Sequence, residues 1–219
     1  MKLLDLEQYL TQHTYPGRGI VLGRTPDNDK VAVAYFIMGR SENSRNRIFE
    51  ETEDGIRTRA FDESKMTDPS LIIYHPVRIL PNGMTVVTNG DQTDTICQHG
   101  DFRKGLMTRE YEPDEPNWTP RISAILNADG SFEMSILKHK NGRCLREFFC
   151  YEGCDENQGY FISTYQGDGN PLPTFAGEPL EVTVPKPEEV WAALNGDNKV
   201  SLYTNVNGEV RLFNKNLGD

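Results

Sequence analysis

The sequence predicts an α+β fold whose sheets are antiparallel. Much of the chain consists of short apolar runs of strand length and composition, separated by turns that contain Gly, Pro, Asn or Asp. Residues 121–126 and 132–137, for example, flank the turn Asn127-Ala128-Asp129-Gly130, as in a β-hairpin. Only a few segments show the apolar spacing of a helix. Many hairpins with few helices among them are typical of α+β proteins.

In the first half of the chain, Leu6 and Leu10 predict a short helix over residues 5–11, which ends before the breaker Pro16-Gly17. The acidic segment 48–69 is expected to be irregular, apart from a short strand at residues 56–60. Strands at residues 19–23 and 30–38 are expected to form one hairpin around the turn 25–29. Residues 71–74 are expected to form a buried strand. Strands at residues 77–80 and 84–88 are expected to form a second hairpin.

In the second half, residues 91–110 have a mixed helical spacing, with acidic residues early and basic residues late. This charge order suits the helix dipole, although Gly100 and Gly105 weaken a helix. Residues 166–187 are rich in Pro and Gly and predict a long loop, whereas residues 188–194 predict a short helix. Strands are expected at residues 121–126, 132–137, 144–151, 159–165, 200–204 and 210–213, of which the last two form a hairpin.

The composition is that of an ordinary globular protein and argues against two kinds of partner. The chain has 219 residues, 37% of them hydrophobic and 26% charged, which is enough to bury a core. A net charge of −10 argues against a nucleic-acid surface, because such surfaces neutralise phosphates. No apolar run approaches the roughly 18 residues of a membrane span, and the early acidic residues are unlike a signal peptide. We therefore expect a cytoplasmic protein that binds neither a nucleic-acid polymer nor a membrane.

The cysteines and histidines form no recognisable metal motif. Cys150 and Cys154 are four residues apart, but Cys97 and Cys144 do not form a second close pair, and no histidine cluster accompanies them. One interpretation is a zinc site with ligands brought together from distant segments. The other is a set of reduced thiols, as is usual in the cytoplasm. The four histidines show no paired spacing, so we assign them no role.

An arginine-rich segment follows the apolar run that ends at Met38. Arg40, Arg45 and Arg47 alternate there with small polar residues, among them Ser41 and Asn46. Forked guanidinium donors at the end of a strand suit a phosphate or carboxylate, and each charge-assisted hydrogen bond contributes about 1.5–3 kcal/mol. The alternative is a solvated turn that balances the acidic residues at positions 50–54.

Three separated motifs resemble the archaeal-type inosine monophosphate (IMP) cyclohydrolase family. They are residues 40–47, the sequence NGDQTDTI at residues 89–96, and NWTPRI at residues 117–122, and the similarity runs in order through about residues 17–165. The resemblance implies a four-layer αββα sandwich of the N-terminal nucleophile (Ntn) hydrolase type, catalysis without a metal or organic cofactor, and a homo-oligomer. It also implies one domain over residues 1–219, with a helical N-terminal extension at 1–16 and a C-terminal extension at 166–219.

The family closes the ring of formamidoimidazole-carboxamide ribonucleotide to form IMP, with loss of water. This reaction needs a donor to the formyl oxygen, a base and an acid, and a clamp on the nucleotide. The resemblance implies that Tyr74 is the donor, that Arg47 stabilises charge near it, and that Glu112 is the general base or acid. Crowded acidic residues are expected to raise the pKa of Glu112. The alternative for Tyr74 is an aromatic residue that only packs at the end of a strand. The alternative for Glu112 is an exposed acidic turn.

The same resemblance implies a set of residues that bind the purine ribonucleotide. Asp94 has an alternative role as a helix cap. The predicted substrate-binding residues are Arg40, Ser41, Arg45, Asn46, Asn89, Asp94, Thr119 and Arg121.

Two other functions remain open from the sequence. One is a purine-nucleotide-binding protein that has lost turnover. The other is an amide hydrolase of the Ntn type, which needs a Ser, Thr or Cys at a processed N-terminus. The chain begins with Met1-Lys2, and removal of Met1 would not expose such a nucleophile.

Overall fold

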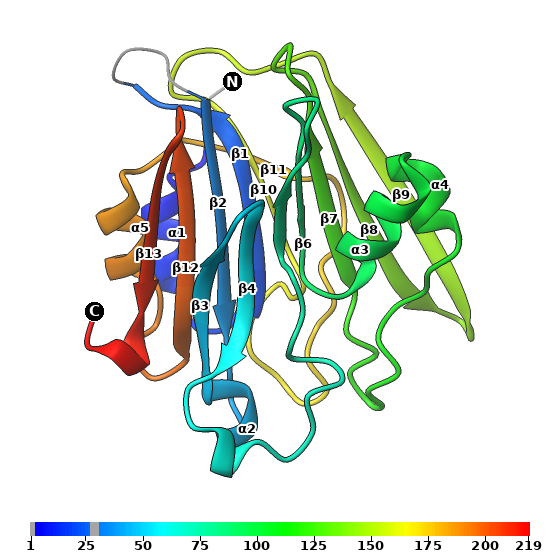
Figure 1. The fold of residues 1–219 in the computed structure, drawn as a ribbon, viewed down its shortest axis with the longest axis vertical. Coiled ribbons are helices and arrows are strands. Elements are labelled where there is room, and N and C mark those ends of the chain that lie inside the picture. The colour runs from blue at the N-terminus through cyan, green and yellow to red at the C-terminus, as the bar shows by residue number, and fades with distance from the viewer. Residues whose placement is uncertain (1–2, 27–30) are drawn as a thin grey trace.

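Two antiparallel sheets pack face to face in the computed structural model, which describes residues 3–26 and 31–219 (Figure 1). Within these residues, the six-stranded sheet has the order β11 (Leu180–Val182), β10 (Gly159–Ser163), β1 (Arg18–Arg24), β2 (Val31–Met38), β12 (Lys199–Val206) and β13 (Glu209–Asn214). The seven-stranded sheet has the order β3 (Arg47–Thr52), β4 (Gly55–Ala60), β5 (Val77–Ile79), β6 (Thr85–Thr88), β7 (Arg121–Leu126), β8 (Phe132–Lys140) and β9 (Arg143–Tyr151).

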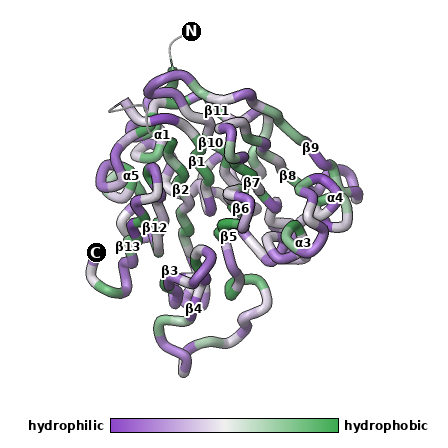
Figure 2. The backbone as a smooth tube through the Cα atoms, turned by 45° about the horizontal axis from the view of Figure 1, so that its top comes forward, coloured by the Kyte–Doolittle hydropathy of each residue, from purple (hydrophilic) through white to green (hydrophobic). Residues whose placement is uncertain are grey.

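The main core lies between the sheets, and the central strands β1 and β2 of the six-stranded sheet are buried on both faces. Ile20 of β1 and Tyr35 of β2 face the other sheet, where they pack with residues such as Ile122 and Ile136. The alternate residues of these strands, such as Phe36, face a second apolar cluster on the outer side. Because both faces are covered, β2 is almost continuously apolar and β1 is apolar between its terminal arginines; the hydropathy colouring shows this central part of the sheet (Figure 2).

Helices cover both outer faces and complete four layers. On the six-stranded sheet, α1 (Leu6–Gln12) and α5 (Pro187–Ala193) contribute side chains such as Leu6 and Trp191 to the outer cluster. On the seven-stranded sheet, α3 (Gln92–His99) and α4 (Phe102–Met107) pack over β6 to β8 (Figure 1). The prediction of an α+β fold with antiparallel sheets is confirmed. The likeness to Ntn hydrolases stays a prediction.

The segment 48–69, expected to be mostly irregular, instead begins with a regular hairpin. β3 and β4 pair from Arg47 opposite Ala60 to Thr52 opposite Gly55. Glu50 lies opposite Arg57 and forms ion pairs with Arg57 and Arg59 across the two strands. Cross-strand charge pairs stabilise a solvated sheet face. The polar composition that suggested irregular structure therefore belongs to a strand pair with one exposed face.

The prediction of a buried strand at residues 71–74 is wrong. These residues form a turn, in which the backbone N–H groups of Ile72 and Ile73 donate to the carbonyl of Pro69. A short apolar run cannot be assigned to a strand by its composition alone. The turn still leads into a fixed position for Tyr74, because the backbone N–H of Tyr74 donates to Thr58 Oγ1 and its carbonyl accepts from the Thr58 backbone.

Residues 91–110 form two helices rather than one. Gly100 ends α3 with a φ of +61°, a conformation that favours glycine, and Asp101 caps α4 by accepting from the Lys104 N–H. The expected long loop at 166–187 contains the strand β11, and the short helices at the surface are α2 (Glu42–Arg45), η1 (Glu63–Lys65) and η2 (Lys215–Leu217). The predicted turn at 25–29 lies partly outside the described residues.

The segments predicted as extensions are built into the six-stranded sheet and its cover. Residues 166–219 supply β11, α5, β12 and β13, and β12 pairs with β2 in the middle of that sheet. Leu4 forms a parallel bridge with Val182, which anchors the start of the described chain to β11. Among the described residues, no helix has the length and apolar character needed to cross a membrane.

Candidate active site

A cleft opens at the edge of the sandwich where β1 begins and β2 ends. Because neighbouring strands are antiparallel, the segments after β2, β4 and β10 and before β1 and β7 meet at this one edge. The cleft has a volume of about 330 Å³, and the polar residues that line it include Arg18, Arg40, Ser41, Ser44, Glu112, Asp114 and Thr119. A narrow recess shares Leu71 and Glu112 with this cleft and reaches Tyr74 and Arg121.

A larger cavity, of about 580 Å³, lies at the other end of β1 beside Arg24 and Cys154. None of the predicted catalytic or substrate-binding residues lines it. The smaller cleft is therefore the candidate active site.

Glu112 is the central ionisable group of the cleft. Its backbone N–H donates to the carbonyl of Thr119 at 2.8 Å, which holds the connection between α4 and β7 in a tight loop. The carboxyl is 2% exposed, and among the described residues its Oε1 atom has no hydrogen-bond partner. Burial raises the pKa of Glu112 to about 7, although Arg18 and Arg121 oppose this rise. Both protonation states are therefore populated near neutral pH.

The cause of this pKa differs from the sequence-based expectation. Crowded acidic residues were expected to raise the pKa, but burial is the main cause, and the neighbouring Asp114 makes a smaller contribution. Asp114 is itself engaged, since its carboxylate accepts from the backbone N–H and the hydroxyl of Thr119. The loop thus presents one buried carboxyl, whose Oε1 has no hydrogen-bond partner among the described residues, and one hydrogen-bonded carboxyl.

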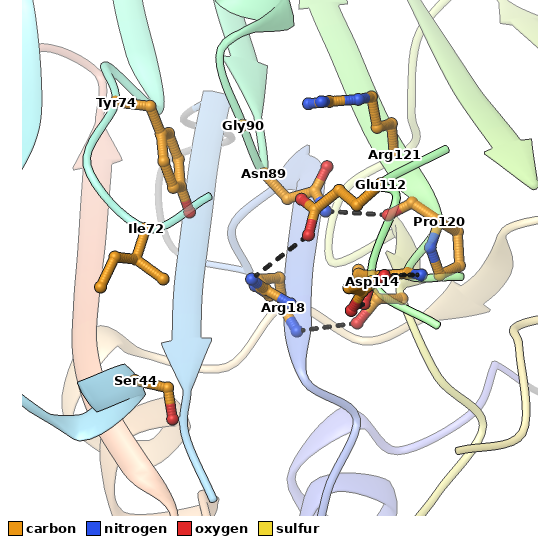
Figure 3. Close-up of polar contacts among 12 residues, drawn as sticks. Arg18, Ser44, Ile72, Tyr74, Asn89, Gly90, Glu112, Asp114, Pro120 and Arg121 are labelled. Atoms are coloured by element: carbon orange, nitrogen blue, oxygen red, sulfur yellow. Dashed lines mark hydrogen bonds and ion pairs between the residues drawn. The ribbon is translucent and has the colours of Figure 1, made fainter. Parts of the chain in front are cut away.

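Arg18, which sequence reasoning missed, lies beside Glu112 at the first position of β1. Its Nη2 is 3.9 Å from Glu112 Oε2, which is an ion-pair distance but too long for a hydrogen bond (Figure 3). Burial lowers the pKa of Arg18, but Glu112 and the phenols of Tyr74, Tyr165 and Tyr15 outweigh this effect and raise it.

The only local signal for Arg18 is the Pro16-Gly17 pair that precedes it. Gly17 has a φ of +78°, and a Cβ at this position would lie 2.3 Å from Thr164 Oγ1. A side chain cannot fit there, so the chain turns closely against the end of β10 and directs Arg18 into the cleft. Sequence reasoning treated this pair only as the end of a helix.

Tyr74 lies across the recess from Glu112, and its hydroxyl is hydrogen-bonded to that of Tyr35 at 2.7 Å. Figure 3 shows the Tyr74 ring and the Glu112 carboxyl on opposite sides of the space above Arg18. Tyr74 is 6% exposed and Tyr35 is fully buried. The pair joins the two sheets, because Tyr35 belongs to β2 whereas Tyr74 precedes β5.

Arg47 lies behind the cleft rather than in its wall. The residue is fully buried, and its side chain donates from Nε to the carbonyl of Ser44 at 2.8 Å and from Nη2 to that of Met38 at 3.4 Å. Burial lowers its pKa, while the nearby phenols of Tyr74 and Tyr35 raise it. Arg47 is thus placed to act on the tyrosines by its charge.

Arg40, Ser41 and Thr119 line the open cleft. The Arg40 guanidinium donates to Asp168 Oδ1 at 2.7 Å and to the Gly169 carbonyl at 2.9 Å, and it lies over the ring of Tyr15. Ser41 caps α2, because its hydroxyl accepts from the Ser44 backbone N–H.

Arg121 and Asn89 lie at and behind the recess. Arg121 is 5% exposed and donates to Gln92 Oε1 at 2.7 Å. Asn89 is fully buried; its side chain donates to the Pro120 carbonyl and accepts from the Ile122 N–H. Asn89 thereby ties the end of β6 to the start of β7, next to the recess.

The other three predicted binding residues are engaged outside the cleft wall. Arg45 donates to the carbonyl of Gly39 and to Asn198. Asn46 exchanges two hydrogen bonds with the backbone of Asp62. Asp94 lies in the first turn of α3 and pairs with Arg78 at 3.0 Å and with His75 at 4.0 Å.

The described part of the chain contains no group of three or more His, Cys, Asp or Glu side chains arranged to hold a metal ion. All four cysteines are free thiols.

Comparison with known proteins gives one family. A family model described as IMP cyclohydrolase-like protein matches residues 15–210, which extends beyond the motifs and includes β12. Comparison with curated proteins gives no match. The chain therefore belongs to the IMP cyclohydrolase-like family.

Proposed function

We propose that this protein is an IMP cyclohydrolase, which closes the ring of formamidoimidazole-carboxamide ribonucleotide with loss of water. The observation that carries the proposal is the buried Glu112 carboxyl, whose pKa is about 7, facing Tyr74 across a recess beside Arg18. A carboxyl of that pKa can accept and return a proton at neutral pH. Membership of the family supplies the substrate class.

In the proposed mechanism, the carboxamide nitrogen attacks the formyl carbon and gives up a proton to the Glu112 carboxylate. The formyl oxygen gains negative charge as its double bond opens, and the Tyr74 hydroxyl donates a hydrogen bond to it. The protonated Glu112 then returns its proton to the departing oxygen. The attack has already closed the ring. The hydroxyl then leaves as water together with the hydrogen of the former formamido nitrogen, which the Glu112 carboxylate takes up and passes to the leaving oxygen, and a carbon–nitrogen double bond forms.

The cations have separate tasks in this proposal. Burial raises the pKa of Glu112, and the charges of Arg18 and Arg121 act against this rise. A useful fraction of the carboxyl is therefore ionised before the reaction. Arg47 stabilises negative charge at the Tyr74 oxygen from behind. Arg40 and Ser41, at the open mouth of the cleft, bind the phosphate of the nucleotide.

The remaining predicted residues support the walls. Asn89 and Asn46 join neighbouring segments through backbone hydrogen bonds, and Arg45 fixes the turn that carries Arg40. Thr119 holds Asp114 and closes the loop of Glu112. Asp94 stabilises the start of α3. A direct contact between these side chains and the substrate remains a prediction.

The test is a turnover assay. Purified protein is mixed with formamidoimidazole-carboxamide ribonucleotide, and IMP formation is followed by ultraviolet absorbance for the wild type, Tyr74→Phe and Glu112→Gln. We expect wild-type turnover and a fall of about tenfold or more in each variant, as for acid–base groups. Glu188→Gln, in an exposed ion pair on α5, is the matched control and is expected to keep wild-type activity.

Two results would contradict the proposal. If neither substitution changed the turnover, Tyr74 and Glu112 would not be the catalytic residues. Absence of turnover, with the nucleotide still raising the melting temperature, would show a binding protein that does not catalyse the reaction.

A further inference from the structure

The hydrogen bond between Tyr35 and Tyr74 raises the question of which hydroxyl donates. The two oxygens are 2.7 Å apart, and each hydroxyl carries one hydrogen. If Tyr74 donates to Tyr35, its hydrogen is occupied and cannot reach a substrate oxygen. If Tyr35 donates to Tyr74, the Tyr74 hydrogen is free to point into the recess. The direction of this bond therefore decides whether Tyr74 can act as a donor.

The surroundings of Tyr35 favour donation by Tyr35. Its side chain is fully buried between the sheets, and within the described residues its hydroxyl has no hydrogen-bond partner besides Tyr74. Apart from Tyr74, the neighbours with the strongest electrostatic effect on the Tyr35 hydroxyl are Arg18 and Arg47. Arginine has only donors, so neither residue can accept the Tyr35 hydrogen. A buried donor is normally satisfied, which leaves the Tyr74 oxygen as its acceptor.

The surroundings of Tyr74 are the opposite. Its side chain borders the recess that Glu112 also lines, so its hydrogen has an outlet that Tyr35 lacks. A hydroxyl that accepts a hydrogen bond also becomes a better donor, because the two bonds polarise each other. The pair is thus asymmetric: one phenol is enclosed by the core and the other borders the recess.

We infer that Tyr35 is a positioning residue, which donates to the Tyr74 oxygen and so directs the Tyr74 hydroxyl hydrogen towards the substrate. This inference rests on the proposed function, in which Tyr74 donates to the formyl oxygen. Tyr35 itself does not touch the substrate. Its effect on the reaction passes through Tyr74.

A double-mutant cycle tests the inference. kcat and KM are measured for the wild type, Tyr35→Phe, Tyr74→Phe and the variant carrying both changes. We expect Tyr35→Phe to lower kcat by about tenfold and to change KM less than about twofold, since the phosphate contacts are untouched. In the Tyr74→Phe background, Tyr35→Phe should have no further effect on kcat, because its only target is gone.

The control is Tyr203→Phe. Tyr203 lies opposite Tyr35 on β12, is 1% exposed and belongs to the same core cluster, but it is not part of the pair. It reports the cost of removing a buried hydroxyl without changing Tyr74, and it should keep kcat near the wild-type value. An equal loss of kcat from Tyr35→Phe with and without Tyr74, or no loss in either background, would overturn the inference.

Failure of the proposed function is distinguishable in the same experiment, because it appears as absence of turnover by the wild type. The pair is then tested without substrate, by NMR of protein labelled with ¹³C at the tyrosine ζ carbon. The Tyr74 resonance is identified by its loss in Tyr74→Phe. It should move in Tyr35→Phe and stay in place in Tyr203→Phe. A Tyr74 resonance that Tyr35→Phe leaves unmoved would show that the two hydroxyls are not bonded, and would overturn the inference.

Discussion

Two ion pairs in the same cleft differ in burial more than in chemistry. Arg40 and Asp168 approach to 2.7 Å at the open mouth, where their side chains are 37% and 51% exposed. Arg18 and Glu112 are 3.9 Å apart, but their side chains are only 11% and 2% exposed. Water screens the closer pair, whereas the longer pair is enclosed by protein. The cleft therefore has a weakly coupled entrance and a strongly coupled interior, and burial rather than distance decides how strongly the two members of a pair interact.

The largest expected effect in the buried pair is on catalysis. Glu112→Gln removes the group that accepts and returns the proton, and we expect kcat to fall by about a thousandfold. The dependence of the remaining rate on pH near 7 should disappear with it. The measurement is a profile of kcat against pH for both proteins. A variant that keeps the wild-type profile would show that another group titrates in this range.

The same substitution should increase stability at alkaline pH. Burial raises the pKa of Glu112 from 4.5 to about 7, so the folded chain holds this proton more tightly than the unfolded chain does. The free energy of unfolding therefore decreases as pH rises from about 4.5 through about 7. The change in pKa corresponds to a loss of about 3 kcal/mol in the free energy of unfolding above pH 7. A glutamine at this position does not ionise, so the variant does not lose this stability.

Urea unfolding of the wild type and Glu112→Gln at pH 5 and pH 8 measures this effect. The two proteins should be similar at pH 5, and the variant should be the more stable protein at pH 8. An unchanged difference in stability between the two pH values would mean that the Glu112 carboxyl is not kept in a raised-pKa environment.

Removal of the cation from the buried pair should shift the pH dependence of the rate. In Arg18→Met, one of the positive charges that lower the pKa of Glu112 is lost. The pKa of Glu112 should therefore rise further, and less of this base is ionised at pH 7. We expect about tenfold lower kcat/KM at pH 7, with a smaller loss at pH 9. Arg18→Lys should recover part of the rate. A loss that is equal at every pH would indicate damage to the fold instead.

The exposed pair should give the smallest effects. Asp168→Asn removes the carboxylate that binds Arg40 at the cleft mouth, and we expect the free energy of unfolding to change by less than about 1 kcal/mol. Because Asp168 competes with an anionic ligand for Arg40, KM for the nucleotide should fall slightly, by about twofold at low salt. Measuring KM at two ionic strengths checks this. A stability loss as large as that expected of a buried pair would contradict the comparison.

Local patterns in the sequence were sufficient for the class of the fold. Residues 121–137 form the expected hairpin, and the strand pair before Arg40 is also present. Such elements depend on the alternation and turn residues of one short segment, which the sequence displays directly. The helix at the start of the chain and the one near residue 190 were predictable for the same reason.

Local patterns gave the wrong prediction where the structure of one segment depends on its contacts with another segment. The polar strands β3 and β4 become regular only because each supplies the other's hydrogen bonds and countercharges. The apolar run before Tyr74 forms a turn instead of a strand, with Ile72 buried and Ile73 exposed, because the Thr58 side chain of β4 donates to the Ile72 carbonyl and accepts from the Tyr74 N–H in place of a paired strand.

For the site, the sequence by itself determined which chemical groups are available: an arginine cluster, an acidic loop and a tyrosine after an apolar run. Only the tertiary structure decided their roles. It buried Arg47 behind the tyrosines, placed Arg18 beside Glu112, and left Arg45 and Asp94 outside the cleft wall. The physical reason is that pKa values and hydrogen-bond directions depend on burial. Burial at this cleft is produced by segments up to about 150 residues apart in the chain, as in the hydrogen bond from the Arg18 N–H to Thr164 Oγ1.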